Sequence, residues 1–256
     1  MGIPAPPAWY VISLRPQGAH EALRRAAQRR GAGLLALSPW RIRASDDDAT
    51  REALRAALDA RRVLFTSPAA VAAAQRLLPL RARDGQTWLA VGAGTADALR
   101  RAGIAEVVAP RRMDSEGLLA LPVLRDVAGQ PIGFVTAPDG RNLLAPTLLA
   151  RGAVLRRAEV YRREPVAFSA KALRRLERLD RPACLLLSSG GALEHALARL
   201  PPPLLDTLRG ATVVAASERL AEAARRSGFA RVVRAEGPRP AQLLDAAGAA
   251  MDARIR

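Results

Sequence analysis

Small hydroxyl-bearing residues and glycines recur in this chain where an apolar, strand-like run gives way to a helix-like run. Two stretches show the pattern best, VLFTSPAAV (63–71) and CLLLSSGGAL (184–193). At such a junction the first backbone N–H groups of the helix lack partners within the helix, and they bind carboxylates and phosphates. Any one hydroxyl could simply cap its helix, whereas five such junctions together indicate an anion-binding edge of a sheet. The residues concerned are Thr66, Ser67, Gly92, Thr95, Ser115, Ser188, Ser189 and Ser217.

Tyr161 is the second residue type that could do chemistry. It is one of only two tyrosines, and it lies in the stretch EVYRREP (159–165). A phenol aimed into a binding site can donate a proton to a leaving group. The alternative is an amphipathic strand residue whose hydroxyl group lies at the surface.

Other catalytic signatures are missing from the sequence. Nothing matches the phosphate-binding pattern GxxxxGK[ST] or the nucleophile pattern GxSxG, and VGAGTA (91–96) has only two of the three glycines of a dinucleotide fingerprint. His20 and His195 lie on expected helices among surface-type residues, far apart in sequence, and with Cys184 they make no metal-ligand pattern. Cys184 lies inside an apolar strand and is expected to be a small buried hydrophobic residue. We therefore expect no metal and no cofactor. The junction hydroxyls, without lysine among them, favour a ligand that carries several carboxylates.

The net charge limits the classes of binding partner that the protein is expected to have. The chain has 256 residues, a formal net charge of +16, and Lys171 as the only lysine among 40 basic residues. Such a surface attracts polyanions, but the arginines are scattered along helical runs and no aromatic residues are interleaved with them, which disfavours nucleic acid as the partner.

The length and distribution of the apolar runs bear on location and assembly. No apolar run reaches the roughly 18 residues that span a bilayer, and the first residues lack the basic and apolar regions of a signal peptide. We expect a cytoplasmic protein without a membrane partner. The sequence has no long uncovered apolar stripe, so we expect a monomer.

Strand-like and helix-like runs alternate along nearly the whole chain, which predicts βαβ units and parallel sheets. We expect strands at 9–14, 33–43, 63–67, 88–92, 106–110, 131–138, 183–189, 211–217 and 231–237, and a long extended segment at 154–166. We expect helices at 20–31, 45–60, 68–78, 95–103, 115–124, 142–152, 169–180, 190–200, 218–228 and from 240 onward, with Pro122 bending or ending its helix.

The order of motifs repeats, which predicts two similar α/β lobes. A strand ending in LFTS or LLSS, a helix, and then AVGAGTADALRRAG or VAASERLAEAARRSG occur in the same order in each half. The first strand–helix–strand unit is too short to fold alone, so we expect it to pack with the C-terminal half. The predicted domains are a discontinuous lobe of 1–41 and 165–256, an inserted lobe of 45–157, and a two-stranded extended linker at about 38–44 and 156–164. This arrangement predicts a cleft between the lobes near the carboxyl ends of the strands.

Several of these stretches together resemble the uroporphyrinogen-III synthase family of tetrapyrrole biosynthesis. They are SLRP (13–16), VLFTSPAAV, AVGAGTADALRRAG, DSEGLL, GRNLLAPTLLARGAVLRRAEVYRR and LLLSSGGAL, and the resemblance runs from about residue 9 to the last helix. The family fold has two α/β lobes joined by a two-stranded linker, the first lobe being discontinuous. The resemblance implies that the substrate is hydroxymethylbilane, a linear tetrapyrrole with eight carboxylates. The family reaction is a cyclising dehydration that inverts ring D through a spiro intermediate and yields uroporphyrinogen III.

The resemblance also implies roles for residues. The junction hydroxyls and glycines, with Arg15 of SLRP and Arg141 of GRNLL, would bind the propionates and acetates, and Tyr161 would be the general acid. Many family members have a Gly-Pro-Thr-like turn where this chain has AASERL, so Ser217 or Arg219 would substitute there. A transient contact with hydroxymethylbilane synthase is a further expectation. The same architecture would also suit a non-catalytic binding or regulatory protein for an anionic ligand.

Overall fold

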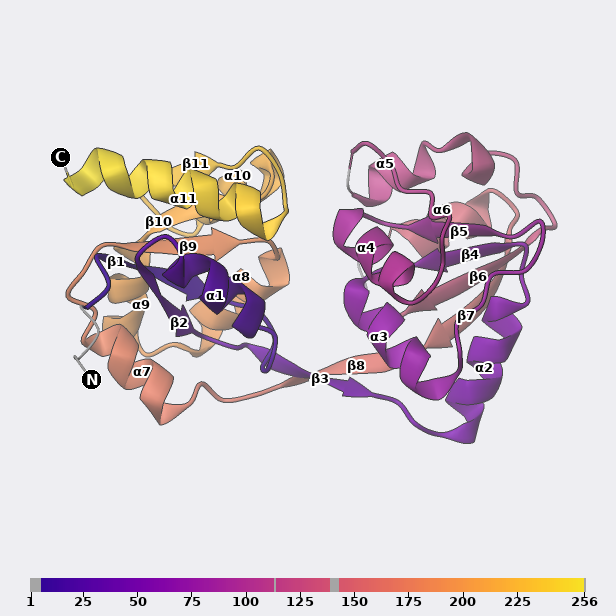
Figure 1. The fold of residues 1–256 in the computed structure, drawn as a ribbon, viewed down its shortest axis with the longest axis horizontal. Helices are drawn as coiled ribbons and strands as arrows, with labels where there is room; N and C mark the ends of the chain where they lie inside the picture. Colours follow the sequence, from indigo (N-terminus) through magenta and orange to yellow (C-terminus); the bar gives the residue numbers. More distant parts are fainter. Residues whose placement is uncertain (1–5, 113, 139–142, 256) are drawn as a thin grey trace. The chain divides into compact units, whose positions relative to one another are not determined.

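The chain folds into two compact α/β units, which this computed structural model describes over residues 6–112, 114–138 and 143–255. One unit is continuous and comprises Ile42–Glu164, and the other combines the segments before and after it, Met1–Arg41 and Pro165–Arg256 (Figure 1).

The discontinuous unit is built on a parallel sheet of five strands in its described part. The strands are β1 (Trp9–Ser13), β2 (Ala32–Ala36), β9 (Ala183–Leu187), β10 (Thr212–Ala215) and β11 (Val232–Arg234), in the order β11-β10-β9-β1-β2. β1 pairs with β2 on one side and with β9 on the other, so the winding of the sheet reverses between β1 and β9. Such a reversal is where open parallel sheets bind ligands.

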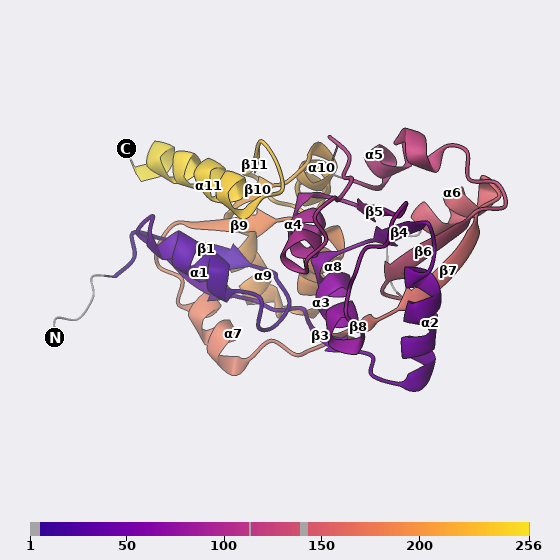
Figure 2. The same cartoon turned by 45° about the vertical axis from the view of Figure 1, so that its right-hand side comes forward.

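Helices cover both faces of this sheet. α1 (Glu21–Gln28) and α11 (Pro240–Ile255) pack on one face, where both Figure 1 and Figure 2 show them side by side. The opposite face carries α7 (Ala170–Glu177), α8 (Gly190–Arg199), α9 (Pro202–Arg209) and α10 (Glu218–Arg226).

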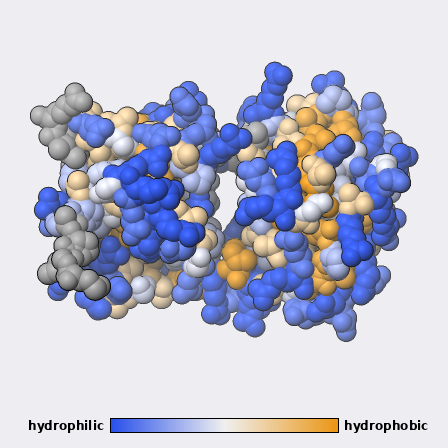
Figure 3. Space-filling view, in the orientation of Figure 1, coloured by the Kyte–Doolittle hydropathy of each residue, from blue (hydrophilic) through white to orange (hydrophobic). Residues whose placement is uncertain are grey.

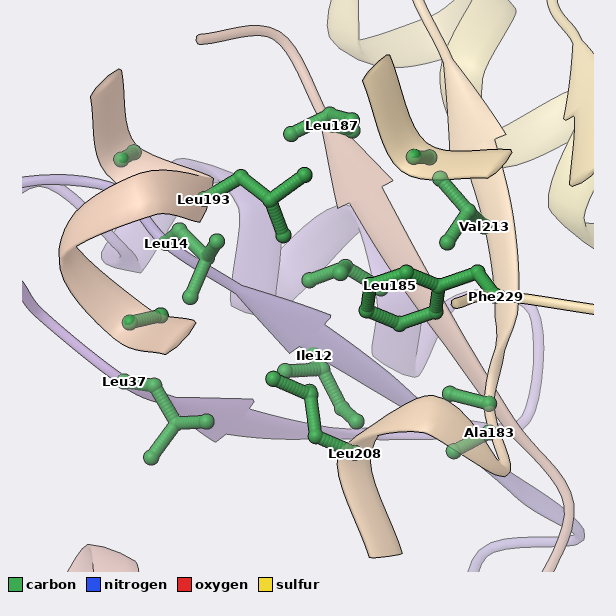
Figure 4. Packing of buried hydrophobic residues seen from close by; sticks show 14 of the residues in the cluster. Ile12, Leu14, Leu37, Ala183, Leu185, Leu187, Leu193, Leu208, Val213 and Phe229 are labelled. Carbon is green, nitrogen blue, oxygen red and sulfur yellow. The ribbon is translucent and has the colours of Figure 1, made fainter. Parts of the chain in front are cut away.

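Side-chain alternation along the strands explains the two covered faces. Val11 and Cys184 pack toward α1 and α11, while Ile12 and Leu185 pack with Leu193 and other residues of the opposite face (Figure 4). Successive residues of a strand point to opposite faces, so a strand covered on both sides must be apolar throughout. All five residues of β9 are buried accordingly.

The continuous unit has a smaller parallel sheet of the same kind. Its strands β4 (Arg62–Phe65), β5 (Thr87–Ala90), β6 (Pro131–Thr136) and β7 (Val154–Glu159) have the order β5-β4-β6-β7. α2 (Asp48–Leu58), α3 (Pro68–Leu77) and α4 (Ala93–Arg101) cover one face, and α5 (Ser115–Leu119), the 3-10 helix η1 (Pro122–Leu124) and α6 (Leu144–Ala150) cover the other. In this sheet the winding reverses between β4 and β6.

β3 (Trp40–Ala44) and β8 (Tyr161–Pro165) form a separate two-stranded pair. Both boundaries between the units fall inside these strands, at Arg41–Ile42 and Glu164–Pro165. The predicted fold class is confirmed, because two parallel α/β sheets, the first of them discontinuous, are accompanied by a two-stranded pair.

The element predictions fail in four places. The expected strand 33–43 is broken into β2 and β3, with Pro39 between them, because proline cannot donate to a strand ladder. The long extended segment expected at 154–166 is likewise two strands, β7 and β8, interrupted at Val160. Residues 106–110 contribute only an isolated bridge at Val108. Finally, the structure has a helix, α9, that was not expected from the sequence, because its proline-rich start is typical of a loop.

Hydrophilic side chains cover much of the face of each unit seen in Figure 3. No helix in the described ranges combines the length and the apolar character needed to cross a membrane.

Candidate active site

The continuous unit contains a cavity of about 490 Å³ at the carboxyl ends of its central strands. Thr66 and Ser67 reach it from the end of β4, and Thr136 from the end of β6. These are the two strands between which the winding reverses, so the cavity occupies the position expected for a ligand site in such a sheet. The other described lining residues are Val91, Ser115, Phe134, Ala137, Pro138, Leu144, Ala145, Arg157, Tyr161 and Arg163.

Ser67 has two structural partners in this cavity. It is the N-cap residue of α3, and its hydroxyl oxygen accepts a hydrogen bond from the Ala70 N–H at 3.1 Å. Its Oγ also lies 2.9 Å from the phenol oxygen of Tyr161. The helix begins here because Ser67 satisfies one of its free N–H groups and Pro68 fits its first position. The cap predicted from the sequence therefore also contacts the predicted general acid.

Tyr161 is the first residue of β8, and its side chain is only 2% exposed. Arg163, two residues further on, has a guanidinium N–H that points to the phenol oxygen at a long distance of 3.5 Å. The guanidinium carbon lies 5.9 Å from the centre of the phenol ring, within the range of a cation–π interaction. The phenol is thus held between a serine hydroxyl and a cation, and the alternative of a surface hydroxyl is wrong.

The hydroxyls of Thr66 and Thr136 are fixed to each other at the ends of β4 and β6. Thr66 Oγ1 donates to Thr136 Oγ1 at 3.0 Å, and Thr136 in turn donates to the Ala137 carbonyl oxygen at 3.3 Å. Because neighbouring parallel strands hold both residues, these polar groups are ordered in advance of any ligand.

The charged side chains of the cavity are basic. Arg157 and Arg163 line it, and no acidic residue is among the described lining residues. Arg157 donates to the Glu159 carboxylate at 2.7 Å and to the Pro138 carbonyl oxygen at 3.4 Å. A large cavity with two arginines, several hydroxyls and one phenol suits an anionic ligand with some apolar surface.

The discontinuous unit has a second, much smaller pocket of about 20 Å³ at the corresponding place in its sheet. Ser13 and Arg15 contribute from the end of β1, and Ser188 and Ser189 from the end of β9. Burial lowers the pKa of Arg15 from its ordinary value, although the guanidinium stays charged. Ser189 caps α8 through the Ala192 N–H at 3.3 Å, as Ser67 caps α3.

His20 lies next to this pocket and contradicts the expectation that it is surrounded by surface-type residues. It is the N-cap residue of α1 and is 7% exposed. Its Nδ1 lies 3.1 Å from Ser13 Oγ and its Nε2 2.8 Å from Ser38 Oγ. Burial, and then the charges of Arg15 and Arg24, lower the pKa of His20 to about 4. The imidazole is therefore neutral at physiological pH and joins β1 to the segment after β2.

The structure separates the remaining predicted site residues from these pockets. Gly92 and Thr95 lie at the start of α4, Thr95 being 2% exposed, and Ser217 precedes α10 without a side-chain cap bond. None of the three is among the described lining residues of either pocket. Arg141 lies outside the described residues.

Three polar residues that line the larger cavity, Thr136, Arg157 and Arg163, were not predicted from the sequence. Thr136 ends an apolar strand as Thr66 does, so the same pattern could have identified it. Arg163 follows Tyr161 by two residues on an expected strand, which places both on one face. Arg157 carries no comparable signal, because arginine is common throughout this chain.

Two parallel sheets, each with a polar pocket where its winding reverses, define a two-unit α/β protein whose pockets suit an anionic ligand. A family model described as "Uroporphyrinogen-III synthase HemD" matches residues 21–245. The chain belongs to this family, and the resemblance seen in its motifs is confirmed.

Individual relatives agree with this assignment. The chain is 30% identical over 144 residues to the uroporphyrinogen-III synthase of Escherichia coli K12, covering 56% of this chain and 58% of the relative. It is 31% identical over 155 residues to that of Salmonella typhimurium LT2, covering 57% and 63%. The aligned part of the chain thus spans about three fifths of the length of these curated relatives.

Solved structures share the fold. A mutant uroporphyrinogen III synthase from Thermus thermophilus superposes with a TM-score of 0.62 at 22% identity, covering 96% of this chain and 99% of that one. The uroporphyrinogen-III synthetase of Helicobacter pylori 26695 gives a TM-score of 0.61 at 14% identity, covering 94% and 99%.

Proposed function

We propose that this protein is a hydro-lyase that converts hydroxymethylbilane to uroporphyrinogen III, with loss of water and inversion of ring D. Family membership supports the reaction. The observation that carries the proposal is the phenol of Tyr161, held by Ser67 and Arg163 at the wall of a basic cavity. A non-catalytic anion-binding protein would need the basic cavity but would have no use for an ordered proton donor.

The carboxylates of the substrate are the groups that this cavity suits. Arg157 and Arg163 provide charge, and the hydroxyls of Thr66 and Ser115 provide hydrogen bonds. In the discontinuous unit, Arg15, Ser188 and Ser189 provide the same chemistry on a smaller scale. Roles for Gly92, Thr95, Arg141 and Ser217 stay predictions.

The chemical step needs one proton delivered and one removed. The bond between the terminal carbon and its hydroxyl oxygen breaks as the neighbouring pyrrole nitrogen supplies electron density. The departing oxygen takes a proton from the enzyme and leaves as water. The substituted α-carbon of ring D then attacks this carbon and forms the spiro intermediate. The older bond from that ring-D carbon to its methylene bridge breaks, and the free α-carbon of ring D bonds to the released bridge. Loss of the proton from this α-carbon restores the aromatic ring and returns a proton to the enzyme.

Most of the specificity is expected to come from positioning. An unrestrained linear tetrapyrrole closes at the free α-carbon and gives the uninverted isomer. Carboxylates held at several fixed points restrict the chain to conformations in which the substituted carbon is attacked. No cofactor takes part in this scheme. We further predict that the protein acts as a cytoplasmic monomer that meets hydroxymethylbilane synthase transiently.

The test is to mix the purified protein with freshly made hydroxymethylbilane, oxidise the products and separate the type I and type III porphyrins. A predominance of type III would support the proposal. Type I alone, formed at the rate seen without protein, would refute it, and stoichiometric binding in that case would identify a binding protein.

A further inference from the structure

We propose that Ser67 Oγ, not the phenol of Tyr161, gives the proton to the departing hydroxyl group. In this relay Tyr161 supplies the proton to Ser67, and Arg163 stabilises the phenolate left behind. The inference rests on the proposed function and refines its mechanism.

Burial is the first reason. Tyr161 is 2% exposed and belongs to the apolar cluster that includes Phe65 and Val135. Ser67 is half-buried and stands at the open end of α3, beside its free N–H groups. A large, carboxylate-rich substrate in the cavity therefore reaches the serine hydroxyl before it reaches the phenol.

The hydrogen-bond directions are the second reason. A hydroxyl group has one donor and two acceptor positions. Arg163 can only donate, so the phenol oxygen accepts from it and the phenol O–H is free to donate to Ser67 Oγ. Ser67 Oγ also accepts from the Ala70 N–H, which fills its second acceptor position. In the relay the phenol is the donor of the Ser67–Tyr161 hydrogen bond, so the serine proton points away from both partners and into the cavity that Ser67 lines.

The relay balances as a single proton shift. The carbon–oxygen bond of the substrate breaks, its electron pair leaves with the oxygen, and that oxygen takes the Ser67 proton to become water. Ser67 takes the phenol proton in the same event. The resulting phenolate is faced by the Arg163 guanidinium, 5.9 Å from the ring centre. When the attacking pyrrole loses its proton, the same path returns it to Tyr161.

Variants of Ser67 separate this role from helix capping. Loss of an N-cap hydroxyl costs about 0.5–2 kcal/mol of stability whatever its catalytic role. Ser67→Asn keeps a good capping group but replaces the hydroxyl with an amide that does not act as an acid. Ser67→Thr keeps both the cap and the hydroxyl. Ser169→Ala is the matched control, since Ser169 caps α7 through the Ala172 N–H at 3.2 Å and does not line either described pocket.

The measurement is kcat and KM for type III product formation, with the melting temperature of each variant. General acid catalysis contributes about 10²–10⁴-fold, so we expect Ser67→Asn to lower kcat by at least ~100-fold with KM changed less than about threefold and the melting temperature kept. Ser67→Thr is expected to recover most of kcat. Ser169→Ala is expected to keep the wild-type kcat.

A double-variant comparison tests whether the two hydroxyls act in series. Residues that act as one unit are non-additive, so Ser67→Asn combined with Tyr161→Phe should be no slower than the slower single variant. Likewise Arg163→Gln should lower kcat in the wild-type background and have no further effect in the Ser67→Asn background, while Arg163→Lys should restore part of kcat.

Wild-type kcat in Ser67→Asn would overturn the relay and leave Tyr161 as the direct donor. Multiplicative losses in the double variant would overturn it as well. The proposed function is judged separately, by whether the wild-type protein forms the type III isomer at all.

Discussion

Acidification should destabilise the discontinuous unit through His20, because burial and the nearby charges of Arg15 and Arg24 disfavour the protonated imidazole in the folded protein. Its Nδ1 and Nε2 both lie within hydrogen-bond distance of hydroxyl oxygens, and Arg15 and Arg24 add positive charge nearby. The folded protein therefore binds a proton only near pH 4, whereas an unfolded histidine does so at about 6.5.

The sign and size of the effect follow from linkage. Above pH 6.5 the imidazole is neutral in both the folded and the unfolded state. Between pH 6.5 and 4 only the unfolded chain takes up the proton, so the free energy of unfolding decreases as the pH is lowered. Below about 4 the loss is complete. At ~1.4 kcal/mol per pKa unit the upper limit is ~3.5 kcal/mol, and partial solvation of the site reduces the expected loss to about 2 kcal/mol by pH 4.5.

The assay is denaturant unfolding of the wild type and of His20→Gln between pH 7.5 and 4.5. Glutamine keeps a hydrogen-bond donor and an acceptor but does not titrate. The Asp and Glu residues are the same in both proteins, so their titration cancels in the difference between the two stabilities. The stability advantage of the wild type should shrink by about 2 kcal/mol over this range. His195→Gln serves as a control for the second histidine. An advantage of the wild type that stays constant with pH would refute the assignment of a buried neutral imidazole.

Three further predictions concern the continuous unit. Tyr161→Phe removes the proton source and should slow type III formation by about 10²–10⁴-fold at an unchanged melting temperature; wild-type turnover would remove the phenol from the mechanism. Arg157→Gln should raise KM severalfold and weaken the salt dependence of kcat/KM with little change in kcat, and an unaltered KM would exclude Arg157 from substrate binding. Gly133→Ala places a methyl group against the Ala57 carbonyl oxygen where α2 packs on β6, so thermal unfolding should show a loss of at least ~2 kcal/mol, and a wild-type melting temperature would contradict this close packing.

The sequence predicts this fold well because the local signals agree with the tertiary structure. Apolar runs such as β9 are buried on both faces, and serine caps mark the starts of α3 and α8 as expected. The exact end of β2 is harder to predict, because the apolar pattern continues through Leu37 and the expected strand 33–43 ran without a break into the expected linker segment.

The candidate site is only partly predictable, because its contacts join residues far apart in the chain. Ser67 and Tyr161 can each be selected from their local sequence, but their contact depends on the placement of β8 beside the end of β4. The Thr66–Thr136 pair similarly requires β6, not β5 alone, to neighbour β4. The polar neighbours of His20 indicate a surface position, whereas as the N-cap of α1 it turns inward toward Ser13 and Ser38.

The position of β1 in the centre of its sheet has a consequence for folding during synthesis. β1 and β2 are synthesised before β9, the neighbour of β1 on its other side, and residues 42–164 lie between them in the chain. The inserted unit is continuous, so all of its contacts can form within one stretch of nascent chain. Until β9 is synthesised, the edge of β1 that pairs with β9 stays unpaired. Domains whose pairings span long separations fold slowly and expose edges that can aggregate. The rate of refolding and the yield of expression should therefore be limited by the pairing of β9 with β1, which happens after the inserted unit has folded.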